Sequence, residues 1–332
     1  MNRLMSTPIW NIKNLTLNGD RQPRLDDISA SIPSGVTAIV GHSGAGKTSL
    51  LNVLAGLEKP HSGTTEFRYP SENAGAFYLP IFWAPQDDGL WPHLSAAEHL
   101  TAVFDPNSSF STEGTQDSEQ FLDNLLVQFD LDLRQQALPS ELSWGEKSRL
   151  AVCRALAANP AVLIMDEPLA HVDPIRRPIY WKLIRDHVET TGASLLFSTH
   201  QPDVAVKEST FVICMQEGKI VHTGTTLDLY HQPTSQKAAE FLGAINWFAA
   251  EEISDWLQST ASGGDAIAIR PENLQLVVVE NGDVEILSFQ FCGGYSETHL
   301  KHIPTNKEKT IVHRPPDNVF AAGQRVAIKV HS

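Results

Sequence analysis

Residues 41–48 read GHSGAGKT and combine three glycines with a lysine and a hydroxyl side chain. The segment matches the phosphate-binding pattern G-x-x-x-x-G-K-[ST], in which glycines let backbone amides wrap a phosphate group. We expect Lys47 to reach the β- and γ-phosphates of a nucleotide, and the Thr48 hydroxyl to bind the magnesium ion that accompanies them. The predicted nucleotide-binding residues here are Gly41, His42, Ser43, Gly44, Ala45, Gly46, Lys47, Thr48 and Ser49.

The sequence around this loop decides between a phosphate site and a glycine-rich turn without a ligand. The apolar run VTAIV at 36–40 predicts a strand before the loop, and LNVLAGL at 51–57 predicts a helix after it that ends at Gly56. A phosphate-binding loop requires this strand–turn–helix context, because the helix N-terminus attracts the anion. The context favours the phosphate site.

Two adjacent acids follow a second apolar run, AVLIM at 161–165. Open α/β sheets bind ligands at the carboxyl ends of their strands. We expect Asp166 to hold magnesium, directly or through water, and Glu167 to orient and deprotonate the water that attacks the γ-phosphate. The alternative is an exposed acidic turn before Pro168, which the phosphate loop upstream makes less attractive.

Two further side chains follow strand candidates and are expected at the same edge. His200 comes after ASLLF at 193–197 and is predicted to donate a hydrogen bond to the γ-phosphate, although a lone histidine is often structural. Gln86 ends another strand candidate, and its amide oxygen can reach the metal. The predicted metal ligands are therefore Thr48, Gln86 and Asp166.

The segment ELSWGEKSRL at 141–150 predicts a helix start. Ser143 and Glu146 form the S-x-x-E capping box, which stabilises a helix by about 1 kcal/mol. The cap leaves Gly145 unexplained, since glycine costs helix propensity in a first turn. A close approach of another molecule to the backbone would explain it.

Composition limits the classes of protein. With 332 residues, 42% of them hydrophobic, the chain is long enough for one large domain and a smaller one, and it is not disordered. The net charge of −14 argues against nucleic-acid binding. Three scattered cysteines suggest neither disulfides nor zinc. Because no apolar run approaches the length of a membrane span, we expect a soluble chain whose membrane contact needs a partner.

The pattern of elements changes along the chain. Apolar runs alternate with helical stretches up to about residue 240, which predicts a parallel sheet with crossover helices, and a hairpin turns near Glu217–Gly218. Residues 105–120 are polar and are predicted to form a surface loop. After Gly243, five short strands separated by turn residues predict a small β-barrel or sandwich; the runs are AIAIR, LQLVVV, VEILSF, KTIVH and RVAIKV.

Taken in chain order, six of these segments resemble the motifs of an ATP-binding cassette (ABC) ATPase: GHSGAGKT the Walker A motif, Gln86 the Q-loop, LSWGE the signature, LIMDEP the Walker B motif, LAHVD the D-loop and STH the H-loop. The resemblance implies an α/β P-loop NTPase fold. The nucleotide-binding domain would span 1–243, with a helical subdomain at roughly 87–158. Residues 244–332 would form an all-β OB-like barrel, since IRPEN at 269–273 and AGQRVAIKV at 322–330 look like the transport-associated OB domain of importers.

The same resemblance assigns roles to residues outside the phosphate loop. The family binds two ATP molecules between two copies arranged head to tail. Ser143, Gly145 and Glu146 would then contact the nucleotide held by the second copy, and Asp173 in the D-loop would link the two sites. ATP bridges the copies and ADP cannot, so that hydrolysis would reopen the dimer.

QDDGLWPHLSAAEHL at 86–100 is similar to the region of bacterial importer ATPases that docks a permease helix. This implies an ATP- and Mg²⁺-dependent subunit of an importer, peripheral to the cytoplasmic face of the inner membrane. Its partners would be transmembrane permease subunits and, indirectly, a solute-binding protein. The alternatives are a soluble ABC ATPase without a transport role, an ATP-binding regulatory module with little turnover, and a small-molecule kinase, which would leave LSWGE and STH unexplained.

The sequence departs from the family pattern at the signature and ahead of the phosphate loop. Trp144 replaces a glycine of the signature, which predicts slowed hydrolysis if that position needs a positive φ. Glu146 replaces a glutamine, a mild change. LTLNGDRQP lacks the aromatic residue that usually stacks on adenine, and Trp10 lies too far upstream and is expected in the first strand. Nucleotide preference is therefore expected to be loose.

Overall fold

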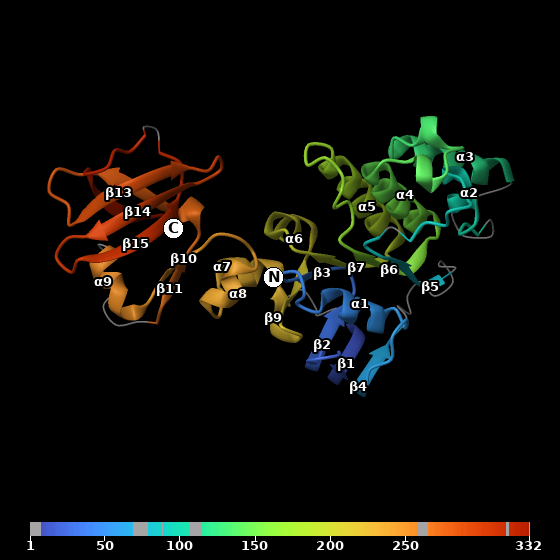
Figure 1. Cartoon of the computed structure of the whole chain (residues 1–332), viewed down its shortest axis with the longest axis horizontal. Helices are drawn as coiled ribbons and strands as arrows, with labels where there is room; N and C mark the ends of the chain where they lie inside the picture. The colour runs from blue at the N-terminus through green and yellow to red at the C-terminus, as the bar shows by residue number, and fades with distance from the viewer. Residues whose placement is uncertain are drawn as a thin grey trace. The chain divides into compact units, whose positions relative to one another are not determined.

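The computed structural model describes residues 8–68, 79–87, 89–105, 115–257, 265–316 and 319–331. The chain divides into two compact units, Met1–Thr226 and Leu227–Ser332 (Figure 1). The sequence places the domain boundary later, at residue 243. Two short helices between these positions, α7 (Thr226–His231) and α8 (Gln236–Glu240), group mainly with the C-terminal unit in the structure.

A six-stranded sheet forms the centre of the first unit. Its order is β5-β6-β7-β3-β8-β9, and every neighbouring pair is parallel except the β8–β9 hairpin. Strands β6 and β7 are buried along their whole length, as expected for parallel strands covered on both faces. The sequence-based prediction of a parallel sheet is confirmed. The strands are β3 (Val36–Val40), β5 (Leu79–Ala84), β6 (Pro160–Asp166), β7 (Ser194–Thr199), β8 (Phe211–Gln216) and β9 (Lys219–Thr225).

The predicted hairpin turn is also confirmed. Glu217 and Gly218 join β8 to β9 with φ of 50° and 76°. Two successive positive φ values match the right-handed twist of the flanking strands, and glycine adopts the second of them without strain.

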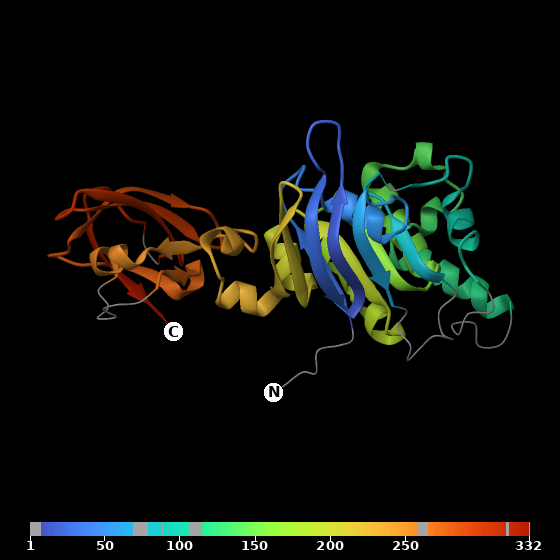
Figure 2. The ribbon, with the colours of Figure 1, turned by 90° about the horizontal axis from the view of Figure 1, so that it is seen from below.

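A second, antiparallel sheet of three strands packs over helix α1 (Lys47–Leu54). It contains β2 (Leu25–Pro33), β1 (Pro8–Leu17) and β4 (Ser62–Phe67). Leu50 and Leu54 of α1 share one apolar core with Ile12 and Leu15 of β1 and with Val162 of β6. The helix thus lies between the two sheets, as Figures 1 and 2 show, and its N-terminus is held in place from both sides.

The remaining helices of this unit are α2 (Ala96–Thr101), α3 (Thr115–Gln128), α4 (Trp144–Ala157), α5 (Arg177–Thr191) and α6 (Pro202–Glu208), with short 3-10 turns at Asp132–Arg134 and Pro139–Glu141. Helices α2, α3 and α4 gather at one end of the unit (Figure 1). They fall within the predicted helical subdomain.

The predicted loop at 105–120 is wrong in its last part, because α3 begins at Thr115. The polar first turn of α3 hides a helical repeat of apolar residues that includes Leu125 and Leu126, both buried. Residues 106–114 of that predicted loop lie outside the described part of the chain.

The C-terminal unit contains an antiparallel sheet in the order β12-β16-β13-β14-β15 and a separate pair, β10-β11. The amide of Arg314, just after β15, donates to the carbonyl of Leu274 at the start of β12 over 3.0 Å, so the two edge strands approach each other. The five predicted strands are present. The elements are β10 (Asn246–Phe248), a 3-10 turn at Ala250–Glu252, α9 (Ile253–Trp256), β11 (Ile267–Ile269), a 3-10 turn at Pro271–Asn273, β12 (Leu274–Val278), β13 (Val284–Phe291), β14 (Ser296–His302), β15 (Lys307–His313) and β16 (Arg325–Val330).

Among the described residues, none of the helices has both the length and the apolar character that a membrane crossing requires.

Candidate active site

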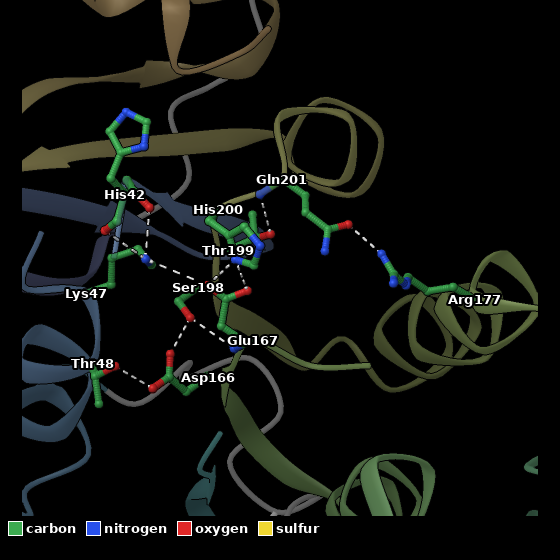
Figure 3. A network of polar contacts seen from close by, with 11 residues as sticks. His42, Lys47, Thr48, Asp166, Glu167, Arg177, Ser198, Thr199, His200 and Gln201 are labelled. Atoms are coloured by element: carbon green, nitrogen blue, oxygen red, sulfur yellow. Dashed lines mark hydrogen bonds and ion pairs between the residues drawn. The ribbon is translucent and has the colours of Figure 1, made fainter. Parts of the chain in front are cut away.

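A cavity of about 570 Å³ opens beside the predicted phosphate loop. The loop itself, the ends of β6 and β7, and Gln86 after β5 line this cavity. The parallel sheet brings these segments together at one edge, because Asp166 on β6 pairs with Ser198 on β7 and Val40 on β3 pairs with Thr199. Figure 3 shows the resulting network of polar side chains. The lining residues predicted from the sequence are His42, Ser43, Gly44, Ala45, Gly46, Lys47, Thr48, Ser49, Gln86, Asp166, Glu167 and His200.

The phosphate loop needs its glycines for steric reasons. Gly46 is the N-cap of α1 with φ of 100°, and a Cβ placed there would lie 2.7 Å from the carbonyl oxygen of Arg24. A Cβ on Gly41 would lie 2.5 Å from the carbonyl oxygen of Met215. The loop is thus wedged between two other backbone segments, and its amides and the N-terminus of α1 are available to an anion.

The Lys47 side chain is buried and turns back on its own loop. Its Nζ donates to the carbonyl oxygens of Gly41, over 2.8 Å, and of His42, over 3.2 Å, and lies 3.7 Å from Oε1 of Glu167 (Figure 3). A buried ammonium group requires such partners. An incoming phosphate would supply stronger, charged acceptors at the same place.

Thr48 and Asp166 form the second contact of the network. The Thr48 hydroxyl donates to Oδ2 of Asp166 over 2.6 Å, and the Ser198 hydroxyl donates to Oδ1. Asp166 is only 3% exposed. A hydroxyl, a carboxylate and the nearby amide of Gln86 are hard oxygen donors, the kind that Mg²⁺ accepts when substrate phosphates complete its coordination. This donor set fits the ion.

Glu167 occupies the centre of the network. Its carboxylate lies 2.9 Å from Nδ1 of His200, and its side chain is 9% exposed, whereas that of His200 is 57% exposed. The backbone of Glu167 has a φ of 51°, an uncommon conformation for a residue with a side chain. A carboxylate held beside a lysine and a histidine can accept a proton from water, which is the role predicted for it.

Ser198 is a functional candidate that the sequence reasoning missed. Its hydroxyl donates to Asp166 and accepts from the amide of Glu167 over 2.9 Å, so one side chain fixes both acids (Figure 3). The signal available in the sequence is its place at the end of the apolar run, two residues before His200. Strand alternation puts it on the same side as the histidine.

Five predicted residues do not line this cavity: Gly41 at the start of the phosphate loop, and Ser143, Gly145, Glu146 and Asp173. Ser143 caps α4, and its hydroxyl and amide bind the Glu146 carboxylate over 2.7 and 2.8 Å, which completes the predicted capping box. These hydrogen bonds lower the pKa of Glu146. The Oδ1 of Asp173 accepts from the amide of Ile175 over 2.8 Å. The roles predicted for these last four residues toward a second copy remain predictions.

Trp144 is not strained. It is the first residue of α4 and is absent from the residues with positive φ, so its amide keeps an ordinary direction. The residue is 65% exposed, and its ring centroid lies 5.6 Å from that of His171 and 5.0 Å from Lys147 Nζ. Gly145 has little room beside it, since a Cβ would lie 3.2 Å from the His171 carbonyl oxygen.

Trp10 belongs to the first strand, as expected. It is 1% exposed and packs against Phe67 with ring centroids 4.9 Å apart. It does not line the cavity and is not available to stack on a base.

The sheet topology and this cavity define the chain as a P-loop nucleotide-hydrolysing protein. The family model described as "ABC transporter" matches residues 25–170. The chain is 30% identical over 334 residues to an Fe(3+) ions import ATP-binding protein of Pectobacterium atrosepticum, covering 92% of this chain and 93% of the relative. It therefore belongs to the ABC transporter family, as an ATP-binding subunit with the ATPase activity of that family.

Two further comparisons agree with this assignment. A sulfate/thiosulfate import ATP-binding protein of Shewanella oneidensis is 29% identical and covers 84% of this chain and 73% of the relative. The solved structure of cbiO1 from Clostridium perfringens, part of an ABC transporter complex, matches with a TM-score of 0.54 and 25% identity, over 68% of this chain and 92% of that one. The fold predicted from the sequence for the cassette is confirmed.

Proposed function

We propose that this chain is the ATP-hydrolysing subunit of a membrane importer, working as a head-to-tail homodimer against separate permease subunits. The observation that carries the proposal is that only part of the predicted site residues lie together in this structure. Lys47, Asp166, Glu167 and His200 meet in one cavity, whereas Ser143 lies outside it. A complete hydrolytic site in this family needs the signature residues, so a second copy must supply them.

In this proposal each residue of the cavity has one task. Lys47 and the loop amides bind the β- and γ-phosphates, while Thr48, Asp166 and Gln86 hold the Mg²⁺ that screens their charge. Glu167 takes a proton from the attacking water, and His200 donates to the γ-phosphate. Ser143, Gly145 and Glu146 of one copy contact the nucleotide of the other, and Asp173 lies between the two sites.

A groove of about 500 Å³ supports a membrane partner. Its lining includes Phe82, Trp83, Trp91 and Arg154. Arg154 is held there by the carbonyl of Gly89, 2.7 Å from Nη1, and its guanidinium lies 4.8 Å from the Trp91 ring centroid. An apolar groove whose lining includes the fixed guanidinium of Arg154 suits a short amphipathic helix of a permease loop.

The names of the relatives further support the importer role: one is named for the import of Fe(3+) ions and another for the import of sulfate or thiosulfate. Because these solutes differ, this chain does not define the solute, and a solute-binding protein would select it. We place the assembly at the cytoplasmic face of the inner membrane and assign residues 244–332, within the C-terminal unit, to the transport-associated OB-like domains.

Copurification tests the proposal directly. The tagged chain is expressed in its own cells, membranes are solubilised in mild detergent, and the recovered proteins are identified with their stoichiometry. We expect multi-span subunits bound to two copies of this chain. Recovery of soluble partners alone, or of none, would contradict the importer role and leave a soluble ABC ATPase.

Trp144 favours a second candidate, a regulatory module that binds ATP with little turnover, because a large exposed ring stands where the family has glycine. The two candidates differ in one measurement. Phosphate release that depends on Glu167 identifies an ATPase, and its absence in the assembled complex identifies a module that only binds.

A further inference from the structure

Five residues that line the nucleotide cavity belong neither to the phosphate loop nor to the catalytic network. They are Gln22, Pro23, Arg24, Glu217 and Gly218. The loop accounts for the phosphates, and the side chains of Asp166 and Glu167 account for metal and water. The part of the cavity that these five residues line is left for the ribose and base of the nucleotide.

This part of the cavity is built rigidly onto the phosphate loop. The Gly218 amide donates to the Ala45 carbonyl over 3.1 Å, and the Asp26 amide donates to the Gly218 carbonyl over 2.8 Å. A Cβ on Gly218 would lie 2.9 Å from the carbonyl oxygen of Arg24. The segment before β2, the hairpin turn and the loop therefore hold one another, and the pocket for the nucleoside is formed before the ligand arrives.

The described lining of the cavity contains no phenylalanine, tyrosine or tryptophan. The imidazoles of His42 and His200 belong to the phosphate loop and to the catalytic network, so none of the five remaining lining residues offers a base an aromatic ring. Among the five, Arg24 carries a planar cation, a guanidinium that can lie flat on a π-face and remains charged at every relevant pH.

Arg24 is held in position without being buried. Its backbone amide donates to the Leu17 carbonyl over 2.8 Å, its Nε contacts the Asn18 carbonyl at 3.4 Å, and its Nη2 pairs with Glu58. Its side chain is 44% exposed. A guanidinium fixed at its edge by these partners can still present a face to a ring.

We propose that Arg24 binds the nucleobase by stacking its guanidinium plane on the ring, and that the site therefore accepts guanine nearly as well as adenine. Stacking discriminates poorly among bases, because every base has a π-face. The inference rests on the proposed nucleotide function and names the residue that sets base specificity.

Calorimetric titration of the full chain with Mg²⁺ complexes of non-hydrolysable ATP and GTP analogues, and with tripolyphosphate, tests this. For the wild type we expect the dissociation constants of the two analogues to agree within about threefold, because stacking discriminates poorly between bases. Arg24→Ala should weaken both by about 3- to 30-fold, the range of an exposed to desolvated cation–π contact, and leave tripolyphosphate binding unchanged. Arg24→Lys keeps the charge without the plane and should resemble Arg24→Ala.

The controls separate the proposal from trivial causes. Arg21→Ala removes the same side chain from an exposed position on the same loop that does not line the cavity, and should bind like the wild type. Lys47→Ala should abolish binding of all three ligands; if the wild type itself binds none, the proposed nucleotide function fails and not only this inference.

Three results would overturn the role of Arg24 while leaving nucleotide binding intact. These are unchanged affinity in Arg24→Ala, full recovery of affinity by lysine, and an equal loss for tripolyphosphate. A preference for the ATP analogue of more than tenfold in the wild type would overturn the tolerance for guanine. Arg24→Tyr guards against a folding defect, because a stacking ring should restore nucleotide affinity.

Discussion

Glu167 meets Lys47 and His200 within one cavity, with its carboxylate 2.9 Å from the imidazole Nδ1. We expect Glu167→Gln to lower the rate of phosphate release by about 10²-fold or more, since a positioned base contributes that much, while ATP still binds. The measurement is phosphate release at saturating Mg-ATP together with a binding titration. Glu189→Gln, the same change at an exposed position of α5, should leave both unchanged. Unaltered turnover in Glu167→Gln would assign the base to another group.

Trp144 stands where the resemblance to the family's signature places a glycine. Its backbone is ordinary, so we expect the ring, and not strain, to slow hydrolysis. The residue is 65% exposed beside Ser143 and Gly145, which should contact the nucleotide of a second copy. We expect Trp144→Gly and Trp144→Ala both to raise turnover at saturating ATP by a few fold. Two variants are needed because glycine also loosens the first turn of α4. Equal rates in all three proteins would show that the ring does not slow hydrolysis.

The residues of the phosphate loop and the two acids were predictable because each lies in a contiguous motif with a strand beside it. Ser198 was not, since its role depends on the register that pairs it with Asp166. Arg24 was not predictable either, because its carbonyl lies beside Gly46 only once β2 and β3, which separate the two residues in the chain, have folded. Contacts between segments that are distant in the sequence carry no local signal.

At the scale of elements, helix α4 depends on its cap. The Ser143 hydroxyl accepts from the Glu146 amide and donates to the Glu146 carboxylate. We expect Ser143→Ala to destabilise the first turn by about 1 kcal/mol and to speed hydrogen exchange of its amides. Ser95→Ala removes the equivalent cap of α2 and should affect only that helix. Identical exchange in Ser143→Ala and the wild type would show that the cap contributes nothing.

The same cap predicts a pH dependence. Hydrogen bonds from Ser143 lower the pKa of Glu146, so the folded helix favours the ionised carboxylate. Its stabilisation is present above the ordinary pKa of 4.5 and is lost as pH falls through the lower folded value. Exchange of the α4 amides, corrected for intrinsic rates, should therefore accelerate on acidification in the wild type and much less in Glu146→Gln. A parallel response of the two proteins would exclude Glu146 as the titrating group.

Strand β14 shows why one element escaped prediction. Its sequence SETHLKH alternates buried and half-buried residues, but Ser296, Thr298 and His302 are the buried ones along with Leu300. Thr298 hydrogen-bonds His313 of β15 over 2.8 Å. Burial alternates along the strand, yet polar side chains occupy most of the buried positions. A search for alternating apolar residues therefore does not identify this strand. Burial lowers the pKa of His313, which keeps this inner pair neutral near pH 7.

At the scale of the molecule, the C-terminal unit has what independent folding requires. Phe248, Trp256 and Leu274 belong to a core of its own. Arg270, 4% exposed, donates to carbonyls of α8 and of the turn after it, including those of Ala239 and Gly243, and ties these segments to the sheet. We expect residues 227–332 expressed alone to unfold cooperatively, read by the fluorescence of the buried Trp256 against denaturant. Arg270→Met should lower the midpoint. A gradual transition of the fragment would show that it depends on the rest of the chain.

The two-part organisation was predictable from the sequence, because alternating strands and helices give way to short strands separated by turns after the β8–β9 hairpin. The three-stranded sheet that covers α1 was not, since its strands are separated by the phosphate loop and its helix. β1 pairs with β4 across that insertion, for example Trp10 with Phe67. Pairing of strands far apart in the chain is set by the shared core and not by adjacent residues.

The backbone at Glu167 has a consequence for the history of such chains. With φ at 51°, a side-chain-bearing residue there costs about 1–2 kcal/mol relative to a glycine. This φ alone would favour glycine or asparagine at position 167, whereas the contacts with Lys47 and His200 and the role proposed for Glu167 in turnover favour the glutamate. We therefore expect a related sequence with glycine at position 167 to have given up the base proposed here while relieving the backbone at that position.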